Sequence, residues 1–192
     1  FYASCERVFN PSLINKPVLV LSNNDGCVIA RSNEVKKIGI KMGEPAFKIK
    51  PLIKKHDIKI FSTNFALYGD MSKRVMNTIV NIIPDIEIYS IDEAFLDLTQ
   101  FKSDNLLELL DSLRKKIFQD TGIPVSIGIA KTKTLSKIAS YIAKKEDKHN
   151  GVFILDESNQ HKILNEFAIE NIWGVGSKTK KFLKYYNIHT AG

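Results

Sequence analysis

The sequence has little cysteine, few histidines and no long hydrophobic run, and each shortage excludes a class of protein. Cys5 and Cys27 are the only cysteines among 192 residues and form no Cys-x-x-Cys pair. Two such cysteines make no disulfide framework, and they favour a reduced, cytosolic setting. The four histidines are scattered, which disfavours a zinc site. No run of about 18 apolar residues occurs, so we expect no membrane span.

Acidic residues are outnumbered by basic ones, 21 against 28, which gives a formal net charge of +7. This excess suggests a polyanionic partner, with nucleic acid first, although a soluble protein that is merely basic is an equal alternative on charge alone. The distribution favours nucleic acid, because no acidic residue follows Glu170. Four lysines follow it close together: Lys178, Lys180, Lys181 and Lys184.

The dipeptide Asp25-Gly26 lies between two β-prone runs, PVLVL and CVIAR. We expect a hairpin here, because glycine tolerates a positive φ. Ser32 can then cap a helix that runs through Ile38 and stops at Gly39.

Further along the chain, the spacing of apolar residues predicts alternating helices and strands. We expect helices over 65–83, 104–121 and 134–145, two strands within 85–98, and one strand each over 125–130 and 151–155. This order predicts an α+β unit of the split βαβ kind, with antiparallel hairpin pairing. The tail from Ile163 is expected to form a separate helical piece.

The stretch YSIDEAFLDL, residues 89–98, reads as sheet, yet Asp92 and Glu93 are neighbours in the middle of it. Two carboxylates about 4 Å apart repel by roughly 4 kcal/mol at an effective dielectric near 20. At a hairpin tip both strands would keep their alternation, although Asp-Glu is not a favoured hairpin turn. A divalent cation would turn the repulsion into chelation, and such oxygen ligands suit Mg²⁺ in a two-metal phosphoryl transfer. A solvated acidic turn is the alternative, and the pair alone favours it.

In its context, YSIDEAFLDL resembles the catalytic hairpin of the Y-family translesion DNA polymerases. Other stretches are similar to motifs of the same family in the same order: FYASCE at 1–6, VLSNNDGCVIARSNEVKKIGIKMGEP at 20–45, NFALYGDMSKRVMNTI at 64–79, SIGIAKTKTLSKIASYIAKK at 126–145 and IWGVGSKTKKFL at 172–183. The stretch SNNDGCVIAR is most similar to the UmuC branch of that family. The resemblance covers essentially the whole chain.

The resemblance implies an α+β fold: a Y-family palm, with a ferredoxin-like antiparallel sheet and helices, small fingers and a partial helix-hairpin-helix thumb. We expect these parts in the order start of palm 1–9, fingers 10–63, palm 64–156 and truncated thumb 157–192. The chain would then be a fragment of a bacterial, cytoplasmic protein. The first catalytic strand, with an aspartate ahead of Phe1, and the little finger would be missing, so we expect the fragment alone to be inactive.

The resemblance also assigns roles to single residues. Asp92 and Glu93 match the family's second and third metal-binding carboxylates, and two Mg²⁺ ions are the implied cofactors. Tyr2 matches the steric gate, whose ring excludes a 2′-hydroxyl; without the family, an aromatic core residue is the alternative. Lys144 matches a lysine that contacts the triphosphate, a task that suits a point charge.

The implied contacts of the fingers depart from the family pattern. Lys36 stands where many relatives carry arginine, and Asn33 where many carry a tyrosine that touches the phosphates. Arg31 is a candidate substitute donor to the nucleotide, or else a solvated surface arginine. Ser90 is expected to be a strand residue near the metal site rather than a reactant.

Gly174, Gly176, Ser177 and Lys178 form a candidate DNA-binding turn. Glycines let a tight turn expose backbone N–H groups at a helix start, where phosphate binds irrespective of base sequence. A plain turn between helices is the alternative, and the acid-free basic tail favours binding.

The resemblance thus implies error-prone, template-directed addition of a dNTP to a primer 3′-hydroxyl, in DNA repair and the SOS response. Its implied partners are primer-template DNA, a UmuD-type dimer, a recombinase filament and a sliding clamp. Two alternatives stay open. One is a non-catalytic DNA-binding or assembly module with a polymerase-like fold; the other is a different two-metal enzyme, such as a nuclease or nucleotidyl cyclase.

Overall fold

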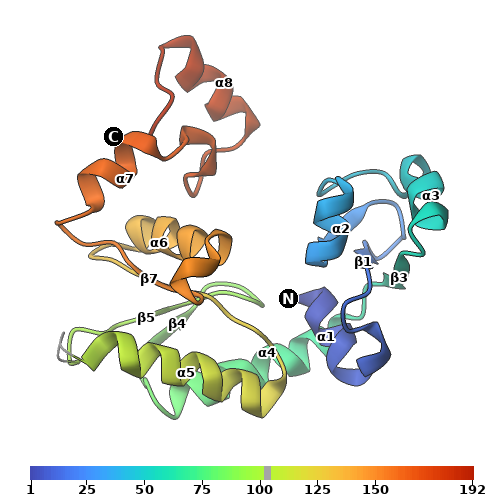
Figure 1. The fold of residues 1–192 in the computed structure, drawn as a ribbon, viewed down its shortest axis with the longest axis horizontal. Helices are drawn as coiled ribbons and strands as arrows, with labels where there is room; N and C mark the ends of the chain where they lie inside the picture. The colour runs from blue at the N-terminus through green and yellow to red at the C-terminus, as the bar shows by residue number, and fades with distance from the viewer. Residues whose placement is uncertain (102–104) are drawn as a thin grey trace. The chain divides into compact units, whose positions relative to one another are not determined.

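The computed structural model describes residues 1–101 and 105–192 (Figure 1). Contacts divide the chain into two units, and each is described by itself. The first comprises Phe1–Phe101 and Lys115–Pro124, and the second Lys102–Arg114 and Val125–Gly192. Helices and strands occur in both units, which confirms the predicted α+β content. The four-part division into palm, fingers, palm and thumb stays a prediction.

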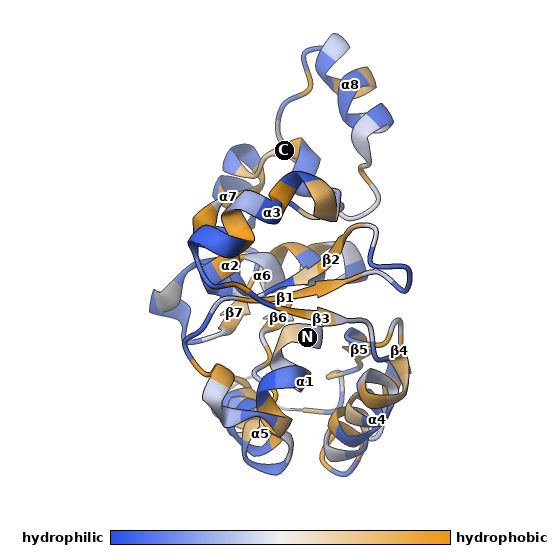
Figure 2. Ribbon diagram, turned by 90° about the vertical axis from the view of Figure 1, so that its right-hand side faces the viewer, coloured by the Kyte–Doolittle hydropathy of each residue, from blue (hydrophilic) through white to orange (hydrophobic). Residues whose placement is uncertain are grey.

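A mixed sheet organises the first unit near its start (Figures 1 and 2). β1 (Val18–Leu21) lies between β2 (Val28–Arg31), which is antiparallel to it, and β3 (Lys59–Ser62), which is parallel. All side chains of β1 are buried, and α2 (Asn33–Ile38) and α3 (Ala46–Lys55) contribute to the same core. The buried residues of this cluster are Leu19, Leu21, Val28, Val35, Ile40, Ile49 and Ile58.

The predicted hairpin between β1 and β2 is confirmed, but its backbone geometry differs from the expectation. The positive φ falls on Asp25, at 53°, and not on Gly26. Aspartate is one of the few non-glycine residues that adopt this conformation readily, and its Oδ2 accepts a hydrogen bond from Ser62 at 3.0 Å. The predicted cap and stop of α2 are both confirmed: Ser32 caps the helix, and Gly39 ends it at a φ of 97°.

Helix α1 (Tyr2–Phe9) is followed by the short 3₁₀ helix η1 (Pro11–Leu13) and contacts α4 (Phe65–Val80). The side chain of Asn64 caps α4. The helix predicted over 65–83 is observed as α4, which ends at Val80, and its apolar residues Met71, Val75 and Ile79 are buried. Tyr68 on the same helix is 0% exposed.

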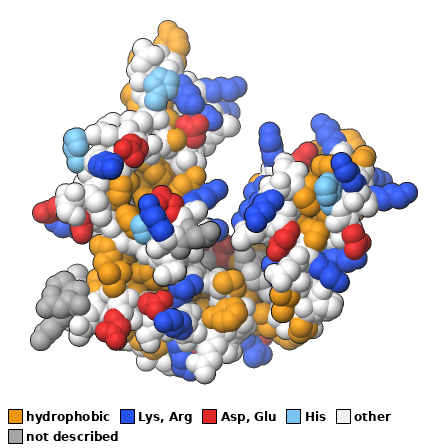
Figure 3. All heavy atoms as spheres, in the orientation of Figure 1, with side chains coloured by type: hydrophobic (Ala, Val, Ile, Leu, Met, Phe, Trp, Pro, Cys, Tyr) orange, Lys and Arg blue, Asp and Glu red, His pale blue; other side chains and the backbone are white. Residues whose placement is uncertain are grey.

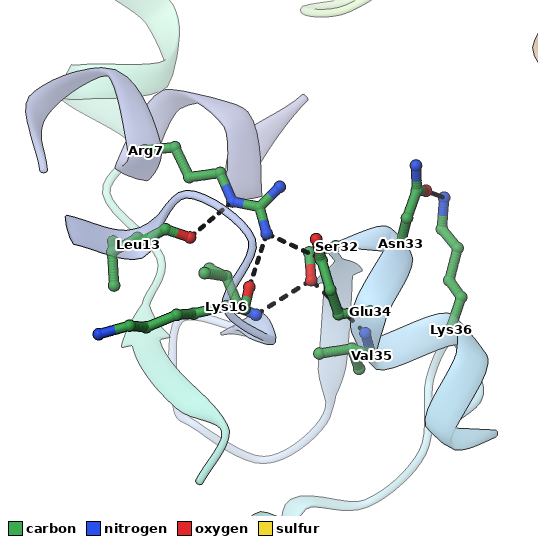
Figure 4. A network of polar contacts seen from close by, with 9 residues as sticks. Arg7, Leu13, Lys16, Ser32, Asn33, Glu34, Val35 and Lys36 are labelled. Atoms are coloured by element: carbon green, nitrogen blue, oxygen red, sulfur yellow. Dashed lines mark hydrogen bonds and ion pairs between the residues drawn. The ribbon is translucent and has the colours of Figure 1, made fainter. Parts of the chain in front are cut away.

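A single guanidinium, that of Arg7, joins α1 to the segments that follow it (Figure 4). Nε donates to the carbonyl of Leu13 at 3.1 Å, and Nη2 donates to the carbonyl of Lys16 at 2.6 Å and to Glu34 Oε2 at 2.7 Å. Partial burial raises the pKa of Glu34, but hydrogen bonds from Ser32 and Arg7 outweigh it, so the pKa lies below its usual value. Arg7 therefore fixes α1 against α2.

The second unit contains a parallel strand pair connected through a helix, a plain βαβ unit, whereas the predicted antiparallel hairpin pairing occurs between β4 (Ile86–Ile88) and β5 (Ala94–Leu96) in the first unit. β6 (Ile127–Ile129) pairs with β7 (Val152–Ile154), and α6 (Lys133–Lys145) connects them. The backbone of α6 lies directly on β6, because a Cβ at Gly128 would collide with the backbone of Ser136 and Ser140. The core of this unit contains Ile138, Ala139, Ile142, Leu155 and Phe167.

The end of the second unit is helical, as predicted from Ile163 onward. Its helical elements are η3 (Asp147–His149), α7 (Gln160–Glu166), η4 (Ile169–Asn171) and α8 (Ser177–Tyr185). The predicted helix over 104–121 is observed as α5 (Leu106–Thr121), and its expected first residue, 104, lies outside the described residues. Within the ranges 1–101 and 105–192, no helix has the length and apolarity that crossing a bilayer requires.

Replacing Arg7 with Ala should lower the free energy of unfolding by about 1–3 kcal/mol, because two carbonyls and a half-buried carboxylate lose their donor. Urea unfolding followed by circular dichroism measures the change. Arg74→Ala is the matched control: Arg74 Nε lies 2.7 Å from Asp70 Oδ2 at an exposed site, where an ion pair contributes roughly 0–1 kcal/mol. Equal losses from the two substitutions would contradict the role of Arg7.

Candidate functional site

Asp92 and Glu93 lie at the tip of an antiparallel hairpin, as predicted. Its strands are β4 (Ile86–Ile88) and β5 (Ala94–Leu96). The amides of Tyr89 and Ser90 both donate to the carbonyl of Glu93, each at 3.0 Å, and close the loop 89–93. Among the described residues with a positive φ, none belongs to this loop. The acidic pair therefore ends a longer loop and does not form a two-residue turn that would require glycine or asparagine.

Ser90 is a loop residue and not the strand residue that was predicted, because β4 ends at Ile88. Its hydroxyl donates to Asp92 Oδ1 at 2.9 Å and accepts the backbone N–H of Asp92 at 3.3 Å. Ser90 thus orients the Asp92 carboxylate within the loop.

Both carboxylates of the acidic pair are exposed to solvent. In water their repulsion at about 4 Å falls to roughly 1 kcal/mol, so the loop can fold without a cation. Across the described part of the chain, no group of three or more His, Cys, Asp or Glu side chains is placed to hold a metal ion. Two carboxylates nevertheless fit Mg²⁺, which usually takes one or two of them together with water and substrate phosphates.

Tyr2, the candidate gate residue, is the first residue of α1 and lies in an aromatic cluster. Its ring stacks on that of Tyr68, with centroids 4.3 Å apart and planes 11° apart, and meets Phe65 edge-on at 6.5 Å. Burial raises the pKa of Tyr2, and the charge of Asp92 raises it further. The roles of Tyr2, Asp92 and Glu93 toward sugar and metal stay predictions.

Sequence analysis missed the support of Tyr2, which comes from Tyr68 and Glu6. The hydroxyl of Tyr68 donates to Glu6 Oε1 at 2.7 Å. Burial raises the pKa of Tyr68, and the hydrogen bond to Glu6 adds to the effect. Tyr2 and Glu6 are four residues apart and lie on the same face of α1, so their spacing was the available indication.

Lys36 and Arg31, the predicted nucleotide contacts of the fingers, both donate hydrogen bonds within the protein. Lys36 Nζ donates to Asn33 Oδ1 at 3.1 Å, which joins the two residues that depart from the family pattern (Figure 4). Arg31 is half-buried, and its Nη1 donates to the carbonyl of Ile40 at 2.7 Å. Arg31 therefore braces the end of β2 and is not a solvated surface arginine. The phosphate roles of Lys36 and Arg31 stay predictions.

Lys144 belongs to the second unit and is exposed in the last turn of α6. A cation in this position also interacts favourably with the helix dipole, so its presence has a structural explanation of its own. Its contact with a triphosphate stays a prediction.

The candidate DNA-binding turn lies directly before α8, and its DNA-binding role stays a prediction. Gly174 has a φ of 90°, and α8 begins at Ser177 after Gly176, which makes no side-chain cap. The first amides of α8 therefore have no capping side chain and can donate to a phosphate. Gly174, Gly176, Ser177 and Lys178 are all exposed. Figure 3 shows basic side chains over α8, and the sequence of this helix makes them lysines.

The lysines of α8 fall into two groups, those that form an ion pair with Glu170 and those that do not pair with it. Glu170 Oε1 lies 3.0 Å from Lys180 Nζ and 3.3 Å from Lys184 Nζ. The hydrogen bond from Lys180 lowers the pKa of Glu170 to about 2. Lys180 and Lys184 therefore tie α8 to η4, whereas Lys178 and Lys181 lie on the exposed part of the helix.

Comparison with solved structures identifies the architecture. The insertion ternary complex of Dbh DNA polymerase matches with a TM-score of 0.86 and 30% identity, over 99% of this chain and 56% of that one. A Y-family DNA polymerase chimera of Dbh and Dpo4 matches with a TM-score of 0.85 and 30% identity, over 99% and 56%. The predicted fold class, that of the Y-family polymerase catalytic region, is confirmed.

The family follows from the sequence comparison. The model of the impB/mucB/samB family matches residues 1–141, and the chain belongs to this family. Protein UmuC of Salmonella typhimurium strain LT2 is 47% identical over 100% of this chain and 46% of its own length. The chain thus spans about half the length of the curated relatives it matches.

Substituting Glu170 with Gln should lower stability at pH 7 and have progressively less effect as the pH falls. The folded-state pKa of Glu170, about 2, lies below its ordinary 4.5. The carboxylate therefore stabilises the fold above pH 4.5, and this stabilisation is lost as the pH falls through the interval down to about 2. Thermal unfolding of both proteins between pH 7 and pH 2 measures the difference.

Glu166→Gln is the control, since Glu166 is exposed in the same unit and lies outside the cluster around Glu170. A gap between wild type and Glu170→Gln that widened towards low pH would contradict the ion-pair role of Glu170.

Proposed function

We propose that the protein is a translesion DNA polymerase that adds dNTPs to a primer 3′-hydroxyl under the direction of a template. The observation that carries this proposal is the exposed acidic pair at the tip of the β4–β5 hairpin, where the hydroxyl of Ser90 orients the Asp92 carboxylate. The similarity to solved DNA polymerases and to UmuC supports it.

The proposed reaction is a phosphoryl transfer. The primer 3′-hydroxyl gives up its proton to solvent as its oxygen attacks the α-phosphorus of the dNTP. A new P–O bond forms while the P–O bond between the α- and β-phosphates breaks, and pyrophosphate leaves. Asp92 and Glu93 would hold Mg²⁺, two ions in the full proposal, which supplies charge neutralisation at the attacking and leaving oxygens when bound. Ser90 orients Asp92 before substrate arrives, so less reorganisation is needed during the reaction.

Tyr2 would set the sugar specificity of this site. Its ring is stacked and half-buried, so it presents a fixed surface that a 2′-hydroxyl would meet and a deoxyribose would not. Burial raises the pKa of Tyr2 above its ordinary value, and the phenol is neutral at physiological pH with or without this shift.

The second unit would hold phosphates without reading base sequence. The turn at Gly174–Lys178 would bind the DNA backbone through amides and a lysine, and Lys144 would contact the triphosphate. We extend the proposal to damaged template DNA and, in the whole protein, to a UmuD-type dimer, a recombinase filament and a sliding clamp. These partners rest on family membership alone.

Replacing Asp92 with Ala in the full-length protein should abolish Mg²⁺-dependent primer extension across an abasic template. Loss of one metal-binding carboxylate removes the charge neutralisation on which phosphoryl transfer depends. Asp97→Ala is the matched control: Asp97 is an exposed carboxylate just after β5 whose Oδ1 accepts the N–H of Thr99 at 2.8 Å. We expect the control to extend primers at close to the wild-type rate.

Two results would contradict this proposal. Primer extension by the Asp92→Ala variant would show that the reaction does not need the Asp92 carboxylate. DNA binding by the wild type without any extension would favour a non-catalytic module.

Replacing Lys178 with Ala should reduce the salt dependence of DNA binding. A log–log plot of affinity against salt should become shallower by about 0.9, the value for one phosphate contact with duplex DNA. Fluorescence anisotropy between 50 and 200 mM salt, a range of about fourfold, measures the slope. Lys184→Ala is the control, because Lys184 is held by Glu170. Equal changes of slope in the two variants would contradict the division of the α8 lysines.

A further inference from the structure

Tyr2 is supported by a pair of residues to which no role has been assigned, Tyr68 and Glu6. Tyr68 is 0% exposed, and its ring lies parallel to that of Tyr2 at 4.3 Å. Its hydroxyl donates to Glu6 Oε1 at 2.7 Å. We call these two residues the Tyr68–Glu6 pair.

The Tyr68–Glu6 pair connects the two helices α1 and α4. Tyr2 and Glu6 both belong to α1, whereas Tyr68 belongs to α4. Tyr68 therefore contacts α1 twice, once through its ring and once through its hydroxyl. Sliding the ring of Tyr68 along Tyr2 would break the hydrogen bond to Glu6 and leave a buried hydroxyl without its partner, which is unfavourable.

A rigid support matters because of what a gate residue does. A bulky ring excludes a 2′-hydroxyl only if the ring cannot tilt or move aside when the ribonucleotide arrives. The stack fixes the plane of Tyr2, and the hydrogen bond fixes the ring on which Tyr2 stacks. Core packing alone would hold the ring less firmly, because the start of α1 is half-exposed.

We propose that the Tyr68–Glu6 pair positions the ring of Tyr2 and thereby sets discrimination between deoxyribonucleotides and ribonucleotides. This inference rests on the proposed polymerase function. Tyr68 and Glu6 are positioning residues, since they act through the ring of Tyr2. Loosening the pair should admit ribonucleotides while leaving the use of deoxyribonucleotides largely intact.

The test compares Tyr68→Phe, Glu6→Ala and the double variant in the full-length protein. The measured quantity is the ratio of kcat/KM for a dNTP to that for the matching rNTP in primer extension. Each single variant should lower this ratio roughly threefold to tenfold, chiefly by raising kcat/KM for the rNTP. The double variant should lower it no further, because both changes remove the same hydrogen bond.

Two further variants calibrate the effect. Tyr2→Ala, which removes the ring itself, should give the largest loss of discrimination. Glu6→Gln keeps an oxygen that can accept from Tyr68 and should restore most of the discrimination lost in Glu6→Ala. Tyr185→Phe is the control for loss of a phenolic hydroxyl, since Tyr185 is 81% exposed on α8, and its ratio should equal that of the wild type.

Three outcomes would overturn the inference. If the ratio of kcat/KM values is unchanged in Tyr68→Phe and Glu6→Ala and dNTP extension is normal, the pair does not position Tyr2, and the proposed polymerase function is unaffected. Parallel losses of kcat/KM for both nucleotides, together with a lower melting temperature, show a purely structural role. Absence of Mg²⁺-dependent extension by the wild type overturns the proposed function itself, and this inference with it.

Discussion

The carbonyl oxygen of Glu93 accepts hydrogen bonds from the amides of Tyr89 and Ser90, and this shared acceptor defines the tip of the β4–β5 hairpin. Because the loop closes there, Asp92 and Glu93 both end up exposed beyond the strands. Neighbouring carboxylates repel, but in water the cost is only about 1 kcal/mol at 4 Å, which a folded loop tolerates easily. The same exposure leaves their oxygens accessible to a hard cation and to the phosphates that accompany it.

Tyr2 belongs to this arrangement because α1 is held from two directions. Arg7 connects α1 to the carbonyls of Leu13 and Lys16 and to Glu34 at the start of α2. On α4, the ring of Tyr68 stacks on Tyr2. These contacts link segments that are distant in sequence, and together they determine where the first residue of α1 lies with respect to α2 and α4.

Features encoded by short stretches of sequence could be predicted, and features that depend on distant partners could not. The cap at Ser32 and the stop at Gly39 depend on single residues with strong local preferences. Strand β3 was missed because it pairs with β1, from which it is separated in the sequence by β2, α2 and α3. Likewise, no local pattern predicts the bond from Arg31 to Ile40, and the spacing of Tyr2 and Glu6 does not indicate that Tyr68 bonds to Glu6. The acidic pair itself was found because of its unusual place between apolar strands, but its loop geometry required the structure.

The most direct measurement is a crystal structure of the full-length protein with primer-template DNA, a non-hydrolysable dNTP and Mn²⁺ as an anomalous substitute for Mg²⁺. We predict anomalous peaks within metal-ligand distance of the carboxylate oxygens of Asp92 and Glu93, beside the triphosphate. Peaks elsewhere, with both carboxylates turned towards solvent, would contradict the central claim that this hairpin tip holds the catalytic metal ions.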